Sequence, residues 1–421
     1  MKPVMAASAV APVAVPYLDC NGTTPVYDEV RAAMLPCLDA SGFGNPSSGH
    51  VYGANAKRKV DNARSQVASL LECDANDVVF TSCGTEADTH AIWGAAFRAK
   101  GAFHVDVPHV VATTAEHPAV IETLKMYEQL GILKYTLAPV TNEGNADPAT
   151  VAECITTSTC LVTCMHANNE VGALTDIAAV SQACRQRAEE MKLPEGQLLI
   201  HTDAAQSVGK VPVSVKAMGV DMLTVVGHKF GAPKGIAALV VIGDELHEGP
   251  KRLVPLLSGG SQERGARAGT ENVPYIVGLG EAARIATEEL DDYMNRTERI
   301  RSIMLADLQA ACSSRGIDMI VHGPSPSDRR LPNTLSVALL GVDAKPMLSA
   351  VGADGVAASG GAACHSGTGS VSGSHVLVAM GHGGANDLLR GTMRLSVGRL
   401  TTEDEARRGV QVLVDQLASS S

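Results

Sequence analysis

The feature of this sequence that most constrains its fold is the alternation of short β-branched runs with longer helical stretches. Six runs have the length and composition of buried strands, at residues 78–81, 110–114, 161–165, 198–202, 222–226 and 236–242. Helical stretches such as 85–100 and 176–191 separate them, and Thr85 and Asp88 are expected to form a capping box at the start of the first. This alternation predicts an α/β fold with a mostly parallel sheet.

The pattern changes after about residue 275, where two long helical patterns begin, at roughly 277–292 and 294–315. Strand patterns at 334–340 and 394–397 and a last helix opened by Thr402 follow them. We therefore expect a large domain at residues 17–280 and a smaller α/β C-terminal domain at 281–421. Residues 1–16, rich in Ala, Pro and Val, are expected to form a flexible N-terminal arm.

Charge and cysteine content exclude several classes of protein. The chain has 34 Lys and Arg against 45 Asp and Glu, and this acidic balance argues against nucleic acid or an anionic membrane as a partner. No apolar run reaches the ~20 residues of a membrane-spanning helix. The 10 cysteines include no Cys-x-x-Cys pair, so neither a metal site nor a disulfide framework is predicted. Ten reduced thiols fit a reducing compartment, and we expect a cytoplasmic protein.

Polar side chains follow five of the predicted strands, at the point where each strand ends. They lie at 82–86, 116–117, 168–170, 203–206 and 227–229. One such group by itself is more often a helix cap or a hydrogen-bonded core residue than a ligand contact. In an open parallel sheet, however, ligands bind beyond the carboxyl ends of the strands. Five groups in register therefore predict one ligand site at that edge.

The chemistry of these side chains suits one kind of ligand. A helix that begins after Gly84 offers backbone N–H groups and a positive dipole end to a phosphate. Lys229 in a buried site can lose its proton and form an imine with an aldehyde. Asp203 can keep a pyridine nitrogen protonated, and His117 can stack on a flat ring. Together these features describe pyridoxal 5'-phosphate, which proteins bind as a lysine Schiff base with an acidic partner for the ring nitrogen.

At these residues the sequence resembles the class V group of pyridoxal-phosphate enzymes, which contains cysteine desulfurases and selenocysteine lyases. The resemblance runs from about Tyr17 to the C-terminal helix. It is carried by NGTTP at 21–25, GNPSS at 44–48, NNEVG at 168–172, HTDAAQ at 201–206, GHKF at 227–230, QERGARAGTEN at 262–272, LPNT at 331–334, GAACHS at 361–366 and RLSVGR at 394–399. The resemblance implies the fold-type I architecture of pyridoxal-phosphate-dependent transferases.

The resemblance also implies roles for individual residues. Lys229 would carry the cofactor and act in catalysis, together with His117 and Cys364, which matches the catalytic cysteine of the group. Contacts to the cofactor would come from Gly84, Thr85, His117, Asn169, Asp203, Gln206, His228 and Lys229. Within this set, Asp203 would pair with the ring nitrogen and Gln206 would hydrogen-bond the ring oxygen.

Other implied roles concern the substrate and a second subunit. Arg394 would grip the substrate carboxylate, a task that suits a bidentate guanidinium group, and Asn45 would also bind substrate. Thr270 would reach the phosphate of the partner's cofactor, which implies a homodimer. Two positions depart from the group: Val226 stands where many desulfurases have a phosphate-binding Ser, and Cys83 stands where Gly is usual.

Two reactions of the group fit these residues. We predict a selenocysteine lyase giving L-alanine and selenide, because His365 directly after Cys364 and Val226 before GHK resemble eukaryotic selenocysteine lyases. The alternative is a cysteine desulfurase that gives L-alanine and a persulfide on Cys364. Either product would need a selenium or sulfur acceptor, for which an acceptor protein is a candidate partner. A non-catalytic scaffold and an ordinary transaminase are further alternatives, and the complete catalytic set argues against the scaffold.

Overall fold

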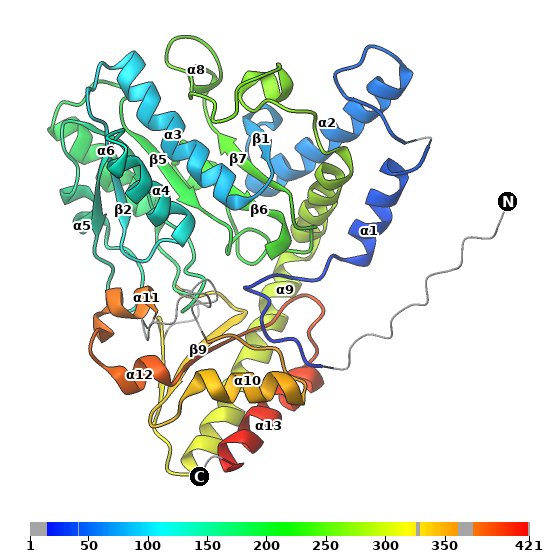
Figure 1. Cartoon of the computed structure of the whole chain (residues 1–421), viewed down its shortest axis with the longest axis vertical. Coiled ribbons are helices and arrows are strands. Elements are labelled where there is room, and N and C mark those ends of the chain that lie inside the picture. Colours follow the sequence, from blue (N-terminus) through cyan, green and yellow to red (C-terminus); the bar gives the residue numbers. More distant parts are fainter. Residues whose placement is uncertain (1–14, 41, 326–328, 361–373, 420–421) are drawn as a thin grey trace.

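In the residues that this computed structural model describes, which are 15–40, 42–325, 329–360 and 374–419, the chain forms a sheet of seven strands and a sheet of three (Figure 1). The large sheet has the order β1-β7-β6-β5-β4-β2-β3. Its strands are β1 (Val78–Thr81), β2 (His109–Thr113), β3 (Lys134–Ala138), β4 (Thr159–Thr163), β5 (Leu199–Asp203), β6 (Met222–Val226) and β7 (Ala237–Val241). Only β7 runs antiparallel to its neighbours, so the predicted, mostly parallel α/β sheet is confirmed.

Helices cover both faces of the large sheet because the strands are apolar on both sides. In β2, Val110 packs with α3 (Gly84–Ala102) and α4 (Pro118–Gln129), whereas its neighbour Val111 lies in the core formed with the helices of the other face. Those helices include α2 (Val51–Leu71), α5 (Pro148–Glu153) and α6 (Ile177–Glu190). Both valines are fully buried, and burial of such a side chain contributes about 1.5–3 kcal/mol.

Two local predictions differ from the structure. Helix α3 begins at Gly84 with Cys83 as its N-cap and has no side-chain cap, so the predicted capping box of Thr85 and Asp88 is wrong. Asp88 is instead buried on the inner side of the helix. Strand β3 was not predicted, because Lys134–Ala138 lies at the sheet edge and only Ala138 is buried, so the segment lacks an apolar run.

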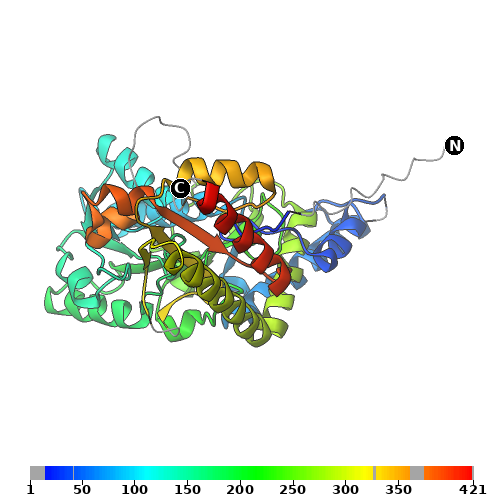
Figure 2. The same ribbon diagram turned by 90° about the horizontal axis from the view of Figure 1, so that it is seen from below.

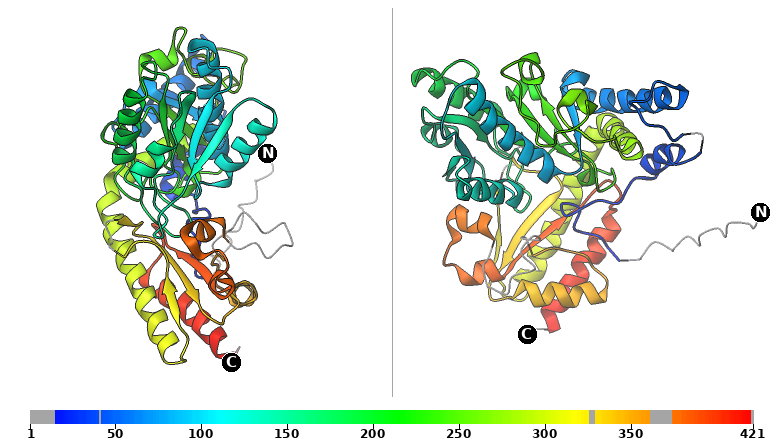
Figure 3. Two further views of the ribbon diagram at one scale, coloured as in Figure 1. Left: turned by 90° about the vertical axis from the view of Figure 1, so that its left-hand side faces the viewer. Right: turned by 45° about the horizontal axis from the view of Figure 1, so that its top comes forward.

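Helix α9 (Val273–Ser313) is one continuous helix where the sequence predicts two. Neither Gly nor Pro occurs from residue 281 to 313, so nothing interrupts its backbone hydrogen bonds through the acidic run at 288–292. Figure 3 (left) shows this helix extending from the large sheet along the side of the small one. The expected domain boundary at residue 280 therefore falls inside a helix, and the division into 17–280 and 281–421 stays a prediction.

The small sheet is antiparallel, in the order β10 (Thr392–Ser396), β9 (Thr334–Leu339) and β8 (Met319–Val321). Its core includes residues of α9, of α10 (Ala344–Asp354) and of α13 (Glu403–Ser419), as Figure 2 shows from below. The N-terminal segment also joins this core, since Leu18 is fully buried in it and Leu18 O accepts from Ser396 N at 2.8 Å. Asn21 and its neighbours consequently lie between the two sheets.

The remaining helices are short and lie at the ends of these elements. They are α1 (Asp28–Met34), α7 (Val215–Met218), α8 (Asp244–His247), α11 (His375–Leu377) and α12 (Asn386–Arg390). Within the described residues, no helix is both long and apolar enough to cross a membrane.

Candidate active site

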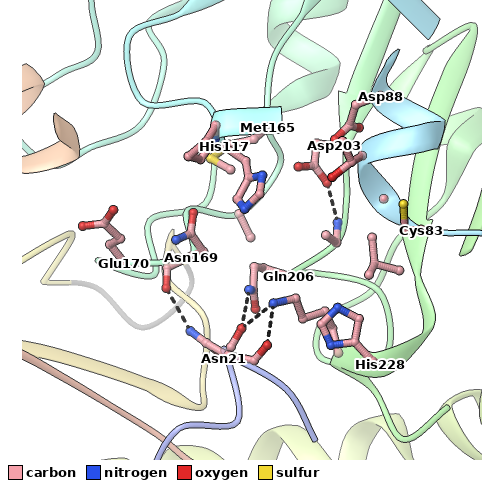
Figure 4. Close-up of a pocket in the computed structure, with 18 of the residues that line it drawn as sticks. Asn21, Cys83, Asp88, His117, Met165, Asn169, Glu170, Asp203, Gln206 and His228 are labelled. Carbon is pink, nitrogen blue, oxygen red and sulfur yellow. Dashed lines mark hydrogen bonds between the residues drawn. The ribbon is translucent and has the colours of Figure 1, made fainter. Parts of the chain in front are cut away.

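A cavity of about 330 Å³ lies beyond the carboxyl ends of β1, β5 and β6, and residues from both sheets line it (Figure 4). The structure brings all five polar strand ends of the sequence analysis to this cavity. Its polar or reactive lining residues are Asn21, Cys83, Thr85, Asp88, His117, Asn169, Glu170, Asp203, Gln206, His228, Lys229, His375 and Arg394. Gly84 and Val226 close the wall beside α3.

Among the described residues, two of the predicted site residues, Asn45 and Thr270, do not line this cavity. Asn45 is exposed, and its Oδ1 accepts from the backbone N–H of Ser47 at 2.9 Å. Thr270 is also exposed and lines a separate hollow of about 220 Å³ beside Ser82. Cys364 lies outside the described residues. The other predicted residues, from Gly84 to Arg394, all meet at the cavity.

Lys229 is presented by the tight turn Gly227–Lys229, which directly follows β6. Its Nζ donates to the carbonyl oxygens of Asn21, at 2.7 Å, and of Gly22, at 2.9 Å. The turn itself is tied to the same segment, because Thr24 N donates to His228 O at 2.9 Å. These contacts hold the amine at the junction between the N-terminal segment and the large sheet, where Lys229 lines the cavity.

One end of the cavity has the character of a phosphate site. Burial lowers the pKa of His228 to about 4, so its ring is neutral at neutral pH, and its Nδ1 lies 3.1 Å from Thr23 Oγ1. Since the Thr23 hydroxyl can donate to Nδ1, the other ring nitrogen can offer its proton to an anion. Gly84, the first residue of α3, lines the same cavity. If any other residue replaced Gly84, its Cβ would lie only 2.6 Å from Val226 Cγ2. Only glycine lets Val226 pack so closely against this helix N-terminus.

Two buried carboxyl groups lie on the wall at the end of β5. Asp203 Oδ1 accepts from Ala205 N at 2.9 Å, and burial raises the pKa of Asp203 while His117 and Lys229 oppose the rise. Asp88 is 2% exposed, and its Oδ1 has no hydrogen-bond partner. Burial, followed by the charge of Asp203, raises the pKa of Asp88 well above its usual range. Ionisation of both groups at once is therefore disfavoured, and the neighbouring His117 and Lys229 favour the charged form of Asp203.

Glu116 and His117 both follow β2, but His117 lines the cavity whereas Glu116 is buried in the core. The Nδ1 of His117 accepts from Ala119 N at 3.1 Å, and burial lowers the pKa of the ring, so a neutral ring carries its proton on Nε2. Figure 4 shows His117 and Asp203 pointing into the same space. Glu116 points into the core, where Oε1 accepts from Thr113 Oγ1 at 2.5 Å and from Met165 N at 3.0 Å. Burial raises the pKa of Glu116 to about 8, which leaves it uncharged at neutral pH.

Arg394 reaches the cavity from β10 of the small sheet. Its side chain is 2% exposed, and its two terminal nitrogens donate to Asn169 O, at 2.8 Å, and to Asp19 Oδ1, at 2.5 Å. The guanidinium group is therefore fixed in the cavity wall by partners from the N-terminal segment and from the large sheet. Its buried Nε has no hydrogen-bond partner.

Sequence reasoning missed two residues that organise this site. Asn21 O accepts from both Lys229 Nζ, at 2.7 Å, and Gln206 Nε2, at 3.0 Å. Lys210, 1% exposed, donates to Gln206 Oε1 at 2.6 Å. Asn21 could have been found, because it begins the NGTTP segment that carries the resemblance. Lys210 gave no such signal, because it belongs to none of the matching segments and only the fold shows that it is buried.

The donor set of this cavity fits pyridoxal 5'-phosphate. An amine for the aldehyde is present at Lys229, a buried carboxylate for the ring nitrogen at Asp203, and a neutral imidazole for the ring face at His117. A helix N-terminus and the neutral His228 supply donors for the phosphate. These residues would hold the cofactor, which when bound supplies an electron sink for the α-carbon of an amino acid.

Comparison with known proteins agrees with this chemistry. The sequence model of the aminotransferase class-V family matches residues 16–408. The cysteine desulfurase of Trichormus azollae is 39% identical over 397 residues, which are 94% of this chain and 91% of that protein. The cysteine desulfurase IscS of Methanosarcina thermophila is 36% identical over 399 residues, 94% of this chain and 90% of that protein.

Two solved structures share the whole fold. A NifS-like protein superposes with a TM-score of 0.83 at 30% identity, covering 96% of this chain and 100% of that one. SspA in complex with cysteine superposes with a TM-score of 0.72 at 30% identity, covering 92% and 100%. The predicted fold-type I architecture is therefore confirmed. The chain belongs to the aminotransferase class-V family and is a pyridoxal-phosphate-dependent enzyme of that group.

Proposed function

We propose that this enzyme removes sulfur from L-cysteine, giving L-alanine and a persulfide on Cys364. The observation that carries the proposal is the cavity that gathers Lys229, Asp203, His117 and Arg394 around one space. Among the two reactions that the sequence allows, the relatives favour the sulfur reaction, because those at 34% to 39% identity bear the name cysteine desulfurase. This choice replaces selenocysteine as the main predicted substrate and retains it as the competing one.

Three residues of the cavity would have separate roles in this reaction. Arg394, fixed by Asp19 and Asn169 O, offers its remaining donors to the substrate carboxylate. Lys229, whose amine enters the cavity, would move the proton of the α-carbon. His117, neutral and carrying its proton on Nε2, would lie against the cofactor ring and could pass a proton to the product.

Transfer of the substrate sulfur to Cys364 needs no external oxidant. The sulfur of Cys364 forms a bond to the substrate sulfur while the substrate C–S bond breaks. The electron pair of the C–S bond stays with the β-carbon, which takes up a proton and becomes the methyl group of L-alanine. The enzyme retains the sulfur as a persulfide, which a thiol of an acceptor protein then attacks.

The test is the rate of L-alanine release from L-cysteine and from L-selenocysteine. With L-cysteine, Cys364→Ser is expected to lower the rate by about 10³-fold or more, because the leaving sulfur loses its nucleophile. Mass spectrometry of the wild type after one turnover should find one added sulfur atom on the peptide that contains Cys364. Cys154→Ser is the matched control, since Cys154 lies at the end of α5, away from the cavity, and its activity should equal that of the wild type.

Four outcomes would contradict the proposal. Turnover of L-selenocysteine alone would restore the selenocysteine lyase prediction. Full activity of Cys364→Ser with L-cysteine would exclude the persulfide route. Release of a keto acid in place of L-alanine would indicate transamination, and absence of any turnover by the loaded protein would favour a scaffold.

We further propose that the enzyme is a homodimer in which Thr270 serves the cavity of the partner. Thr270 is exposed and lies in a hollow outside its own cavity, which supports a role in trans. Large apolar side chains near the start of α2 are also exposed, with Phe43 at 59% and Val51 at 75%. Such an apolar surface is typical of a region that another subunit covers.

Subunit mixing tests the role of Thr270. Thr270→Ala is expected to raise the Kd for pyridoxal phosphate about 10-fold or more, because a hydrogen bond to a charged group contributes about 1.5–3 kcal/mol. A hybrid of one Thr270→Ala subunit with one Lys229→Ala subunit contains one complete site if Thr270 acts across the interface. The isolated hybrid should therefore show wild-type affinity at one of its two sites. A hybrid that keeps the weak affinity, or sedimentation of the protein as a monomer, would disprove the proposal.

A further inference from the structure

Lys210 is a buried lysine that none of the proposed catalytic steps uses. It lies 1% exposed behind Gln206, where its Nζ donates to Gln206 Oε1 at 2.6 Å and to Asn21 Oδ1 at 3.1 Å. In the described part of the chain no carboxylate forms an ion pair with it. Burial, followed by the charge of Lys229, lowers its pKa to about 7. A buried amine is costly to keep, so its contacts call for an explanation.

The contact to Gln206 decides which way the amide of that residue points. A protonated lysine amine only donates, so in that state Gln206 must turn its carbonyl oxygen toward Lys210, as the contact in the structure shows. The amide nitrogen is then on the opposite side, where it donates to Asn21 O at 3.0 Å. Without Lys210 the amide could rotate by half a turn and exchange its oxygen and nitrogen.

The side to which the amide nitrogen points is the side of Lys229. Gln206 Nε2 and Lys229 Nζ share one acceptor, Asn21 O, at 3.0 and 2.7 Å (Figure 4). In pyridoxal phosphate the ring oxygen and the aldehyde occupy neighbouring carbon atoms. A donor that lies beside the lysine amine therefore meets the ring oxygen when that amine holds the aldehyde.

We propose that Lys210 is a positioning residue that orients the amide of Gln206, so that its N–H group faces the ring oxygen of the cofactor beside Lys229. Lys210 does not touch the cofactor and acts through Gln206. The proposal rests on Lys229 as the residue that holds the cofactor. Asn21 completes the arrangement from the other side, since its Oδ1 also accepts from Asn333 Nδ2 at 3.1 Å.

The visible absorbance of the bound cofactor, followed as a function of pH, tests this proposal. A donor to the ring oxygen stabilises the form in which that oxygen carries the most negative charge, which is the form that has lost the proton on the neighbouring nitrogen. Loss of the donor therefore raises the pH midpoint of the absorbance change. Lys210→Met, which keeps the length of the side chain but has no donor, should raise the midpoint by about one pH unit.

The charge of Lys210 could also move this midpoint, and a double-mutant cycle separates the two effects. The titratable groups that face Lys210 are Lys229, Cys20 and Arg394, and all three are kept in every variant. If Lys210 acts through Gln206, Lys210→Met should add less than about 0.3 pH units in a Gln206→Leu background. If Lys210 acts by its charge alone, the same shift should appear in both backgrounds, and the proposal is wrong.

Controls keep the outcome clear. Lys216→Met, at an exposed position of α7, should leave the midpoint unchanged. Borohydride trapping of the cofactor on Lys229 shows that each variant is folded and loaded. If Lys210→Met does not fold, Lys210→Leu replaces it, and the same rise of the pH midpoint is expected. An unchanged midpoint in the variant, with normal trapping in the wild type, would overturn the role of Lys210 alone. A wild type without visible absorbance and without a trapped adduct would overturn the role of Lys229.

Discussion

Replacement of Lys229 by alanine is expected to abolish the visible absorbance of the cofactor and to lower L-alanine release by about 10³-fold or more. The amine is the only lysine nitrogen among the described residues that line the cavity. The variant loses both the covalent attachment and the base at the α-carbon. The measurements are the absorbance spectrum after loading with pyridoxal phosphate and the mass of the peptide containing residue 229 after borohydride reduction.

Lys234→Ala is the matched control for that experiment. Lys234 is exposed in the loop that follows the same turn, so its loss should leave the spectrum and the trapped peptide unchanged. A trapped adduct on Lys234, or normal turnover by Lys229→Ala, would show that the cofactor is held elsewhere. Asn21 and Gly22 would then hold the Lys229 amine for structural reasons only.

The second large effect is expected on stability. Glu263→Ala should lower the free energy of unfolding by about 3–5 kcal/mol, because it leaves a buried arginine without its counter-ion. Glu263 forms two hydrogen bonds of 2.7 Å with Arg64, and its Oε2 also accepts from Phe80 N at 2.9 Å. The side chains of both charged residues are less than a tenth exposed. The measurement is the urea midpoint of the wild type and the variant at equal protein concentration.

Asp61→Ala is the control for this prediction, because Asp61 forms an ion pair with Lys57 in which both side chains are more than half exposed. Its loss should cost no more than about 1 kcal/mol. Equal effects of the two substitutions would contradict the argument from burial.

Glu263 and Arg264 also adopt left-handed backbone conformations, with φ of 48° and 56°. Loss of Glu263 should therefore loosen the loop that leads to Thr270 and weaken cofactor binding as well.

Much of the large sheet could be predicted from the sequence because its strands are apolar on both faces. The six predicted runs correspond to β1, β2, β4, β5, β6 and β7. The bounds of β1 and β6 agree with the prediction, and those of the other four differ by one or two residues. Strand β3 was missed because it lies at the edge and needs no apolar run. The two predicted C-terminal helices merged into α9 because local charge does not end a helix when no Gly or Pro interrupts it.

The candidate site could be predicted as a set of residues but not as a set of contacts. Strand ends carry the signal for Asp203, Lys229 and His117, because the edge of a parallel sheet collects them. Asn45 and Thr270 follow no predicted strand and were predicted from the family resemblance alone. Both lie outside the cavity of their own chain, and the role of Thr270 at the partner's cofactor stays a prediction.

Most of the succession of strands and helices along the chain, and the chemical character of the cavity, follow from the sequence alone, because both depend on local periodicity and on the residue that follows each strand. Which groups meet became clear only from the folded chain. Asn21, Gln206 and Asn333 are far apart along the chain, and they share hydrogen bonds because the N-terminal segment lies between the two sheets. The physical reason is that a buried polar group takes its partner from whatever the fold places beside it.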